Sequence, residues 1–113
     1  MKKKKTYLIT GAGSGFGWEI ALRMAEDHED VIAGVANHRQ AKELAEEARK
    51  RNVSMRIAKL DITSSEDREL AGTWDVDVLL NNAAVSLGGS MADIPEEVLR
   101  KQYEVNFFGT IFL

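Results

Sequence analysis

Short apolar runs and segments with helical spacing alternate along the chain. Four continuous or alternating apolar runs, bounded by glycine or polar residues, are typical of buried strands: residues 7–9, 31–36, 53–60 and 76–80. Four other segments either carry apolar residues at helical spacing or begin with capping residues: residues 16–25, 41–48, 64–71 and 93–113. The pattern therefore predicts the element order βαβαβαβα.

Strands and helices that alternate in this way can satisfy their hydrogen bonds as a parallel sheet with right-handed helical crossovers. The sequence therefore predicts an α/β fold, a doubly wound parallel sheet of the Rossmann type, in one domain over residues 1–113. Such sheets bind ligands beyond the carboxyl ends of their strands. A glycine-rich turn follows the first strand at that edge.

Composition agrees with a single soluble globular domain. The 113 residues are 44% hydrophobic and 29% charged, which is enough for one core and too little for two domains. The absence of cysteine excludes disulfides, thiolate zinc sites and a cysteine nucleophile, and it favours a cytoplasmic location. His28 and His38 have no partners at metal-ligand spacing, so we expect no metal site.

The charge pattern argues against nucleic acid and membrane partners. Lysines occupy positions 2–5, but the whole chain has a net charge of −3, so the rest of it is more acidic still. No apolar segment of secretory or membrane-spanning length follows the lysines. We interpret them as a solvated entry to the first strand.

The glycine turn runs from Thr10 to Gly17. Its spacing is G-x-x-x-G-x-G on Gly11, Gly15 and Gly17; Phe16 breaks the G-x-G-x-x-G alternative. Glycines allow a tight turn and let a pyrophosphate reach the free N–H groups of the following helix. The turn therefore predicts a phosphate-bearing ligand, and the lack of a Gly-Lys-Ser/Thr triplet excludes a P-loop.

Four motifs together resemble the amino-terminal, cofactor-binding half of the short-chain dehydrogenases/reductases. They appear in the family's order and spacing: the glycine turn, Leu60-Asp61-Ile62-Thr63, Asn81-Asn82-Ala83-Ala84 and Val105-Asn106. Ala84 stands where the family usually has glycine. The glycine turn alone also fits a methyltransferase that uses S-adenosylmethionine, but the two asparagine motifs favour the dehydrogenases.

The resemblance implies a role for each matching residue. Gly11, Gly15 and Gly17 would shape the pyrophosphate turn, with Ser14 and Phe16 beside it. Asp61 would hold the adenine amino group, with the Ile62 backbone next to it, and Asn82, Ala83 and Ala84 would line the ribose. Asn81 would stabilise the sheet itself. Asn106 would hold, through its carbonyl, a water in a proton relay to the active-site lysine.

The choice between NAD and NADP stays open at this level. An acid about 20 residues after the glycines would hold the ribose 2′-hydroxyl, and a base would favour the 2′-phosphate. No acid occurs there before Glu43. Asn37 could bond a hydroxyl, and His38 and Arg39 could either meet a phosphate or serve only as surface residues at the start of a helix.

The family's catalytic Tyr-x-x-x-Lys does not occur in the 113 residues. Four residues after the two tyrosines, Tyr7 and Tyr103, where the motif needs lysine, the chain has Gly11 and Phe107. The apolar residues 107–113 predict a helix buried on several sides. We therefore expect a domain incomplete at its carboxyl end, inactive alone, and a homo-oligomer contact through this helix. Gly88 and Gly89 would form a mobile element over the substrate.

The leading hypothesis is an NAD(P)-dependent oxidoreductase that transfers hydride between nicotinamide and a small alcohol or carbonyl substrate. The alternative is a non-catalytic NAD(P)-binding module.

Overall fold

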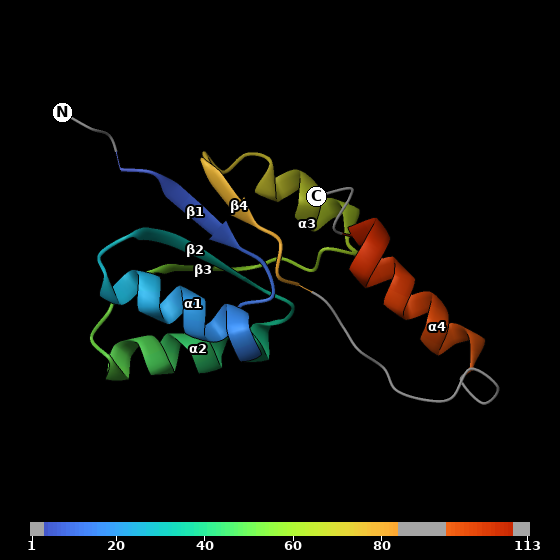
Figure 1. The fold of residues 1–113 in the computed structure, drawn as a ribbon, viewed down its shortest axis with the longest axis horizontal. Helices are drawn as coiled ribbons and strands as arrows, with labels where there is room; N and C mark the ends of the chain where they lie inside the picture. The colour runs from blue at the N-terminus through green and yellow to red at the C-terminus, as the bar shows by residue number, and fades with distance from the viewer. Residues whose placement is uncertain (1–3, 84–94, 110–113) are drawn as a thin grey trace.

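The computed structural model describes residues 4–83 and 95–109, which form a four-stranded sheet with helices against it (Figure 1). Every strand pair is parallel and the strand order is β3-β2-β1-β4. The elements follow the predicted order: β1 (Thr6–Ile9), α1 (Gly15–Glu26), β2 (Asp30–Val35), α2 (His38–Lys50), β3 (Arg56–Lys59), α3 (Ser65–Ala71), β4 (Val78–Leu80) and α4 (Glu96–Tyr103), which continues as a π-helical segment (Glu104–Gly109). The predicted doubly wound parallel sheet is confirmed.

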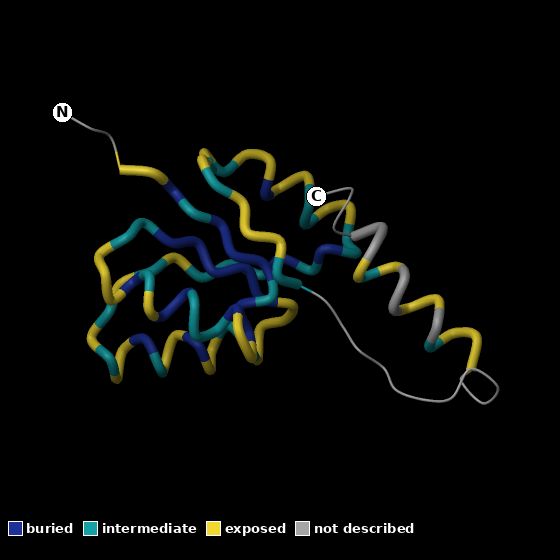
Figure 2. Tube along the Cα trace, viewed as in Figure 1, coloured by how far each residue is buried: buried dark blue, intermediate teal, exposed yellow. Residues whose placement is uncertain are grey.

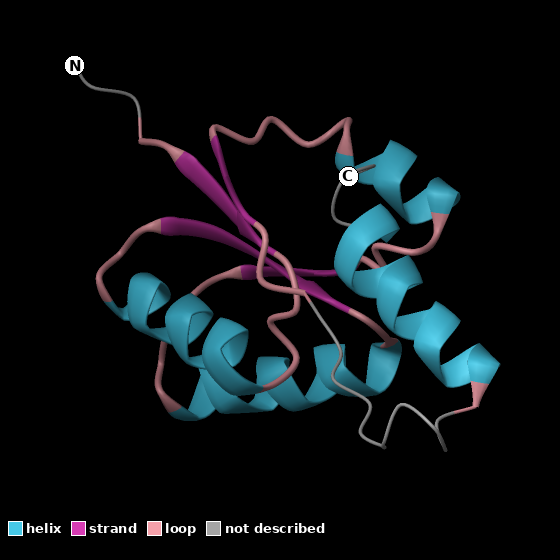
Figure 3. Cartoon of the chain, turned by 45° about the vertical axis from the view of Figure 1, so that its right-hand side comes forward, coloured by secondary structure: helices cyan, strands magenta, loops and turns pink. Residues whose placement is uncertain are grey.

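Two apolar clusters cover the two faces of the sheet. Consecutive residues of β1 point to opposite faces, so Ile9 packs under α1 and α2 with Leu22 and Leu44, whereas Leu8 packs with Leu60 on the face of α3. Figure 3 shows α1 and α2 together on one side, and α3 and α4 away from them. Burial on both faces explains why the central strands β1 and β2 read as continuous apolar runs (Figure 2).

Two strands begin later than the apolar pattern predicts. The run from Val53 becomes strand only at Arg56, because the Val53 N–H donates to the Ala48 carbonyl and completes the end of α2. The run from Val76 becomes strand at Val78. Asp77 lies just before it and bonds the start of β1, since the Thr6 N–H donates to Asp77 Oδ2 at 2.8 Å.

The capping signals are only partly confirmed. Ser64 Oγ accepts from the Asp67 N–H at 3.2 Å, so Ser64 caps α3 as its sequence indicates. Helix α4 begins at Glu96, with Pro95 before it and no side-chain cap. Asp93, the expected cap of that helix, lies outside the described residues, as do Ala84, Gly88, Gly89 and residues 110–113.

Strand β4 lies at one edge of the four-stranded sheet, paired with β1. Leu79 and Leu80 on this strand are 40% and 41% exposed, more than any residue of the central strands β1 and β2. Among the described residues, no helix has the length and apolar character to cross a membrane.

Candidate functional site

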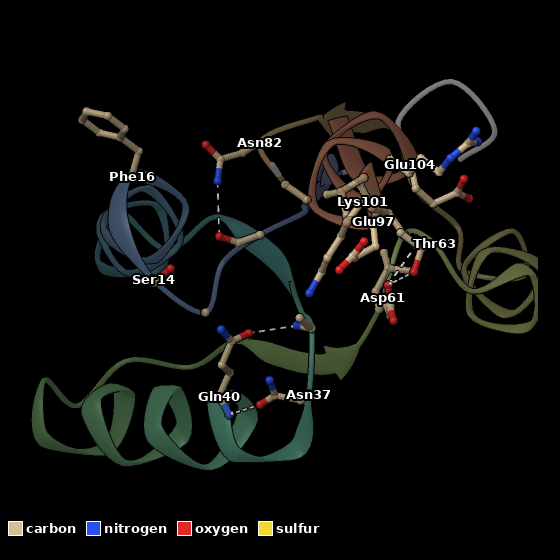
Figure 4. Close-up of a pocket in the computed structure, with 18 of the residues that line it drawn as sticks. Ser14, Phe16, Asn37, Gln40, Asp61, Thr63, Asn82, Glu97, Lys101 and Glu104 are labelled. Atoms are coloured by element: carbon tan, nitrogen blue, oxygen red, sulfur yellow. Dashed lines mark hydrogen bonds between the residues drawn. The ribbon is translucent and has the colours of Figure 1, made fainter. Parts of the chain in front are cut away.

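A cleft of about 1240 Å³ opens at the carboxyl ends of the strands (Figure 4). Its wall combines the glycine turn, the corner between β2 and α2, the end of β3, the segment after β4, and one face of α4. Most of the residues assigned to the site from sequence line this cleft: Gly11, Ser14, Phe16, Asn37, Asp61, Ile62, Asn82 and Ala83. Parallel strands end at the same edge of a sheet, so segments far apart in sequence meet here.

The glycine turn needs glycine for two different reasons. Gly11 and Gly15 have φ of 66° and 59°, a backbone conformation that side chains disfavour. A Cβ on Gly11 would also lie 2.6 Å from the Cα of Ala83, so the turn and the segment after β4 touch backbone to backbone. A Cβ on Gly17, inside α1, would collide with the Gly11 carbonyl oxygen, whereas the space beside Gly15 is open.

The amino end of α1 at the cleft carries no side-chain cap. Ser14, the residue before the helix, is exposed and makes no capping hydrogen bond, and the Trp18 N–H donates to its carbonyl at 3.3 Å. The first N–H groups of a helix have no partner within the helix, and the helix dipole is positive there. Ser14 thus leaves this end of α1 available to an anion from the cleft.

Thr10 joins the glycine turn to the segment after β4, a role that no sequence motif indicates. Its hydroxyl is in a residue only 1% exposed and accepts from the N–H groups of Asn82 and Ala83, each at 3.0 Å. The hydroxyl donates in turn to the Leu80 carbonyl at 3.4 Å. Its position between strand and glycine turn was visible in the sequence, but its partners lie 70 to 73 residues away.

Asn82, rather than Asn81, stabilises the turn through its side chain. Asn82 Nδ2 donates to the Gly11 carbonyl at 3.2 Å, and Figure 4 shows this bond across the top of the cleft. Asn81 is exposed. The role in the sheet expected for Asn81 stays a prediction, whereas the bond from Asn82 to the glycine turn is a contact that the sequence did not indicate.

Asp61 is held rigidly at the end of β3. Its Oδ1 accepts from both the N–H and the hydroxyl of Thr63, at 3.0 and 2.6 Å, which forms an Asx turn. Its N–H donates to Asp67 Oδ2 at 2.8 Å. The neighbouring Ile62 also lines the cleft, and it is only 4% exposed.

An ion pair between Lys59 and Asp67 stabilises the backbone at Asp61. Lys59 Nζ lies 2.7 Å from Asp67 Oδ2, the oxygen that also accepts from the Asp61 N–H. The hydrogen bond from Lys59, followed by the one from the Asp61 backbone, holds the pKa of the Asp67 carboxyl below its usual range. The same pair raises the pKa of Lys59. Asp67 thus carries a negative charge that ties α3 to the end of β3.

Asn37 and Gln40 form the corner between β2 and α2. Asn37 Oδ1 accepts from the Gln40 N–H at 2.9 Å and caps α2, and Gln40 Oε1 accepts from the Ala36 N–H at 2.9 Å. Gln40 also packs on Gly13, where a Cβ would collide with its side chain. Sequence reasoning singled out Asn37 and missed Gln40, whose contact with Gly13 no local pattern indicates.

Helix α4 contributes charged residues that the motifs do not include. Glu97 and Lys101 of α4 line the cleft together with Glu104 of the π-helical segment, and Figure 4 shows Lys101 pointing into it. Val105 lines the cleft, but Asn106 is an exposed residue of the π-helical segment and is not part of the lining. The catalytic role of Asn106 stays a prediction. No cluster of three metal-ligating side chains occurs within residues 4–83 and 95–109.

Thr10→Val should lower the free energy of unfolding, because the isosteric methyl cannot accept from the Ala83 N–H. We expect a loss of about 1–3 kcal/mol, the usual cost of an unsatisfied buried donor. Urea unfolding measures it. Thr10→Ser, which keeps the hydroxyl and removes a methyl, is the control; equal losses in the two variants would contradict the role given to the hydroxyl.

Asp67→Asn should make the free energy of unfolding less dependent on pH in the acidic range. The pKa of Asp67 is lowered in the folded chain, so its contribution is complete above the unfolded value of about 3.9 and is lost as the pH falls through the lower, folded pKa. The urea midpoint of the native chain should thus exceed that of the variant at pH 7, and the gap should narrow below about pH 4. The exposed Glu46→Gln serves as control. A gap that stays constant with pH would refute the ion pair's contribution.

Comparisons with known proteins agree with the motifs. The profile of the family described as short chain dehydrogenase matches residues 5–113. The uncharacterized oxidoreductase YusZ of Bacillus subtilis is 36% identical, with 96% of this chain and 41% of that protein aligned. A diacetyl reductase, (S)-acetoin forming, of Staphylococcus epidermidis is 31% identical over 96% of this chain and 44% of that protein.

Solved structures show the same fold. Actinorhodin polyketide ketoreductase with NADPH superposes with a TM-score of 0.83 at 28% identity, over 96% of this chain and 44% of the ketoreductase. A 7α-hydroxysteroid dehydrogenase complexed with NADH and 7-oxo glycochenodeoxycholic acid gives 0.79 at 31% identity, over 96% and 44%. The chain spans less than half the length of each of these relatives. By its motifs, fold and family profile, the chain belongs to the short-chain dehydrogenases.

Proposed function

We propose that the cleft binds a nicotinamide dinucleotide, NAD or NADP, and that the whole protein is an oxidoreductase acting on an alcohol or carbonyl substrate. The observation that carries the proposal is the uncapped amino end of α1, where the space beside Gly15 is open. A pyrophosphate needs free N–H groups, a positive helix end and no Cβ in its path. The relatives solved with NADPH and NADH support this choice of ligand.

The other cleft residues fit the two ends of such a ligand. Asp61 is fixed in orientation by Thr63, and a carboxylate, which only accepts hydrogen bonds, suits the amino group of adenine. Ile62 would add backbone contacts next to it. Asn82 and Ala83 would line the ribose, with Ala84 following them in sequence. Gly17, by its lack of a side chain, allows the turn to close over α1.

The proposed chemistry is hydride transfer, which the bound nicotinamide supplies. The chain's own residues bind and orient that cofactor. Asn106 would contribute its carbonyl to a proton relay, as the family resemblance implies. The diacetyl reductase among the relatives supports a small carbonyl or alcohol as substrate. The family's Tyr-x-x-x-Lys does not occur within the 113 residues, which favours binding without turnover by this stretch of chain alone.

Location and assembly complete the proposal. A cytoplasmic protein is supported by the absence of cysteine, and the apolar sequence of residues 107–113 supports a homo-oligomer contact through the last helix. Neither nucleic acid nor membrane is a proposed partner, because the chain has an acidic balance.

Ser14→Asp should weaken the binding of NADH and NADPH alike. Ser14 makes no capping hydrogen bond, so its replacement removes none and α1 stays stable, but the charge and oxygens of aspartate compete with the pyrophosphate for the helix end. We expect a rise in Kd of about tenfold or more, measured by the fluorescence of the reduced nicotinamide. Ser14→Asn caps equally well without charge and should weaken binding less. Unchanged affinity in Ser14→Asp would place the pyrophosphate elsewhere.

The 113-residue chain should bind reduced cofactor and still leave it unoxidised in the presence of diacetyl and other small ketones. The phenol and ammonium that would deliver the proton are absent from it. Absorbance at the nicotinamide band measures turnover, and a fluorescence titration in the same buffer shows that the cofactor is bound. Carbonyl-dependent oxidation by this chain would contradict the requirement for Tyr-x-x-x-Lys.

A further inference from the structure

Two side-chain amides at the corner between β2 and α2 have their orientation fixed by the backbone. Asn37 Oδ1 accepts from the Gln40 N–H, and Gln40 Oε1 accepts from the Ala36 N–H, both at 2.9 Å. A backbone N–H can only donate, so each amide must direct its oxygen to the backbone. The remaining polar group of each side chain is its NH₂, which only donates.

Both amides belong to the wall of the cleft. Figure 4 shows Asn37 and Gln40 side by side on the floor of the cleft, with dashed lines from their oxygens to the chain. Gln40 is half-buried against Gly13 of the glycine turn, and Asn37 is exposed. A ligand bound at the glycine turn therefore meets hydrogen-bond donors at this corner.

No carboxylate balances these donors locally. The stretch from Gly34 to Gln40 contains no acid, and it includes the basic residues His38 and Arg39. Glu43, the first acid after it, has its Oε1 3.7 Å from Arg39 Nη1 in a pair whose side chains are 50% and 74% exposed. Such an exposed pair is weak, so the Arg39 guanidinium can turn to another anion.

The two forms of the cofactor differ at this corner in hydrogen-bonding character. A ribose 2′-hydroxyl is best held by a carboxylate that accepts its proton, whereas a 2′-phosphate offers only acceptors and a negative charge. Donors without a carboxylate match the phosphate. We propose that this chain prefers NADP(H) to NAD(H), with Asn37 and Gln40 as the specificity-determining residues; the inference rests on the proposed dinucleotide site.

The test compares four ligands on the 113-residue chain. NADPH and NADH are titrated by fluorescence, and 2′,5′-ADP and 5′-ADP are titrated by calorimetry, since they differ only in the 2′-phosphate. We expect each 2′-phosphorylated ligand to bind at least tenfold more tightly than its partner. Equal or reversed affinities would overturn the preference while leaving the dinucleotide site intact. Binding of none of the four would overturn the proposed function, and the preference with it.

Two variants assign the preference to the amides. Asn37→Asp and Gln40→Glu keep the oxygens that accept from the Gln40 and Ala36 N–H groups, but each replaces an NH₂ donor with a negative oxygen. Each should weaken NADPH at least tenfold and leave NADH unchanged or tighter, with an unchanged urea midpoint.

The matched control is Asn52→Asp. Asn52 is exposed, follows α2 at the opposite end of that helix, and adopts φ of 55°, which aspartate also tolerates. This variant adds the same charge away from the cleft, so it should leave the ratio of the two affinities as it is. If Asn52→Asp lowers the ratio as much as Asn37→Asp does, the effect is one of net charge and the assignment to the corner is overturned.

Discussion

The cleft depends on the contact between two backbone segments, the glycine turn after β1 and the residues that follow β4. Gly11 lies so close to Ala83 that a Cβ on the glycine would come within 2.6 Å of the opposing Cα. Three hydrogen bonds hold this contact. The Thr10 hydroxyl accepts from the backbone N–H groups of Asn82 and Ala83, and the Asn82 side chain donates to the Gly11 carbonyl. Because β1 and β4 are adjacent parallel strands, their ends are already in register for it.

Helix α1 begins a few residues after this contact, and its amino end lacks a bond that other helices of the chain have. Helices α2 and α3 are capped by the side chains of Asn37 and Ser64, whereas Ser14 provides no side-chain cap for α1. A missing cap costs about 1 kcal/mol. The one helix of these three that lacks the bond is the one that begins against the glycine turn, and departures from local rules of this kind concentrate at functional sites.

The fold could be predicted from the sequence because its signals are local. Strands and helices are marked by apolar patterns or capping residues within their own segments. Ser64, for example, caps α3 by accepting from the N–H of Asp67, only three residues further on. The site could be predicted only where a motif marked it. Thr10 bonds and Gln40 packs on residues that periodicity does not connect to them, and nothing in the local sequence indicates that the Asn82 side chain bonds the Gly11 carbonyl. The predicted starts of two strands were too early. Val53 bonds the end of α2, and the Asp77 carboxylate bonds the start of β1, so neither residue belongs to the strand that follows it.

The corner between β2 and α2 shows how one residue can serve the fold and a ligand without conflict. Asparagine, aspartate and serine are all effective caps, and the helix dipole favours a negative charge at that position. Stability of α2 therefore gives no reason to choose Asn37 over an aspartate.

What distinguishes the amide of Asn37 is the second group on its side chain, which is a donor where aspartate has another acceptor. Since the oxygen already accepts from the Gln40 N–H, that second group is the part of the cap left for the proposed ligand. The same division holds for Gln40, whose oxygen binds Ala36. The hydrogen-bonding character of this corner is thus fixed by which atoms the backbone has already used.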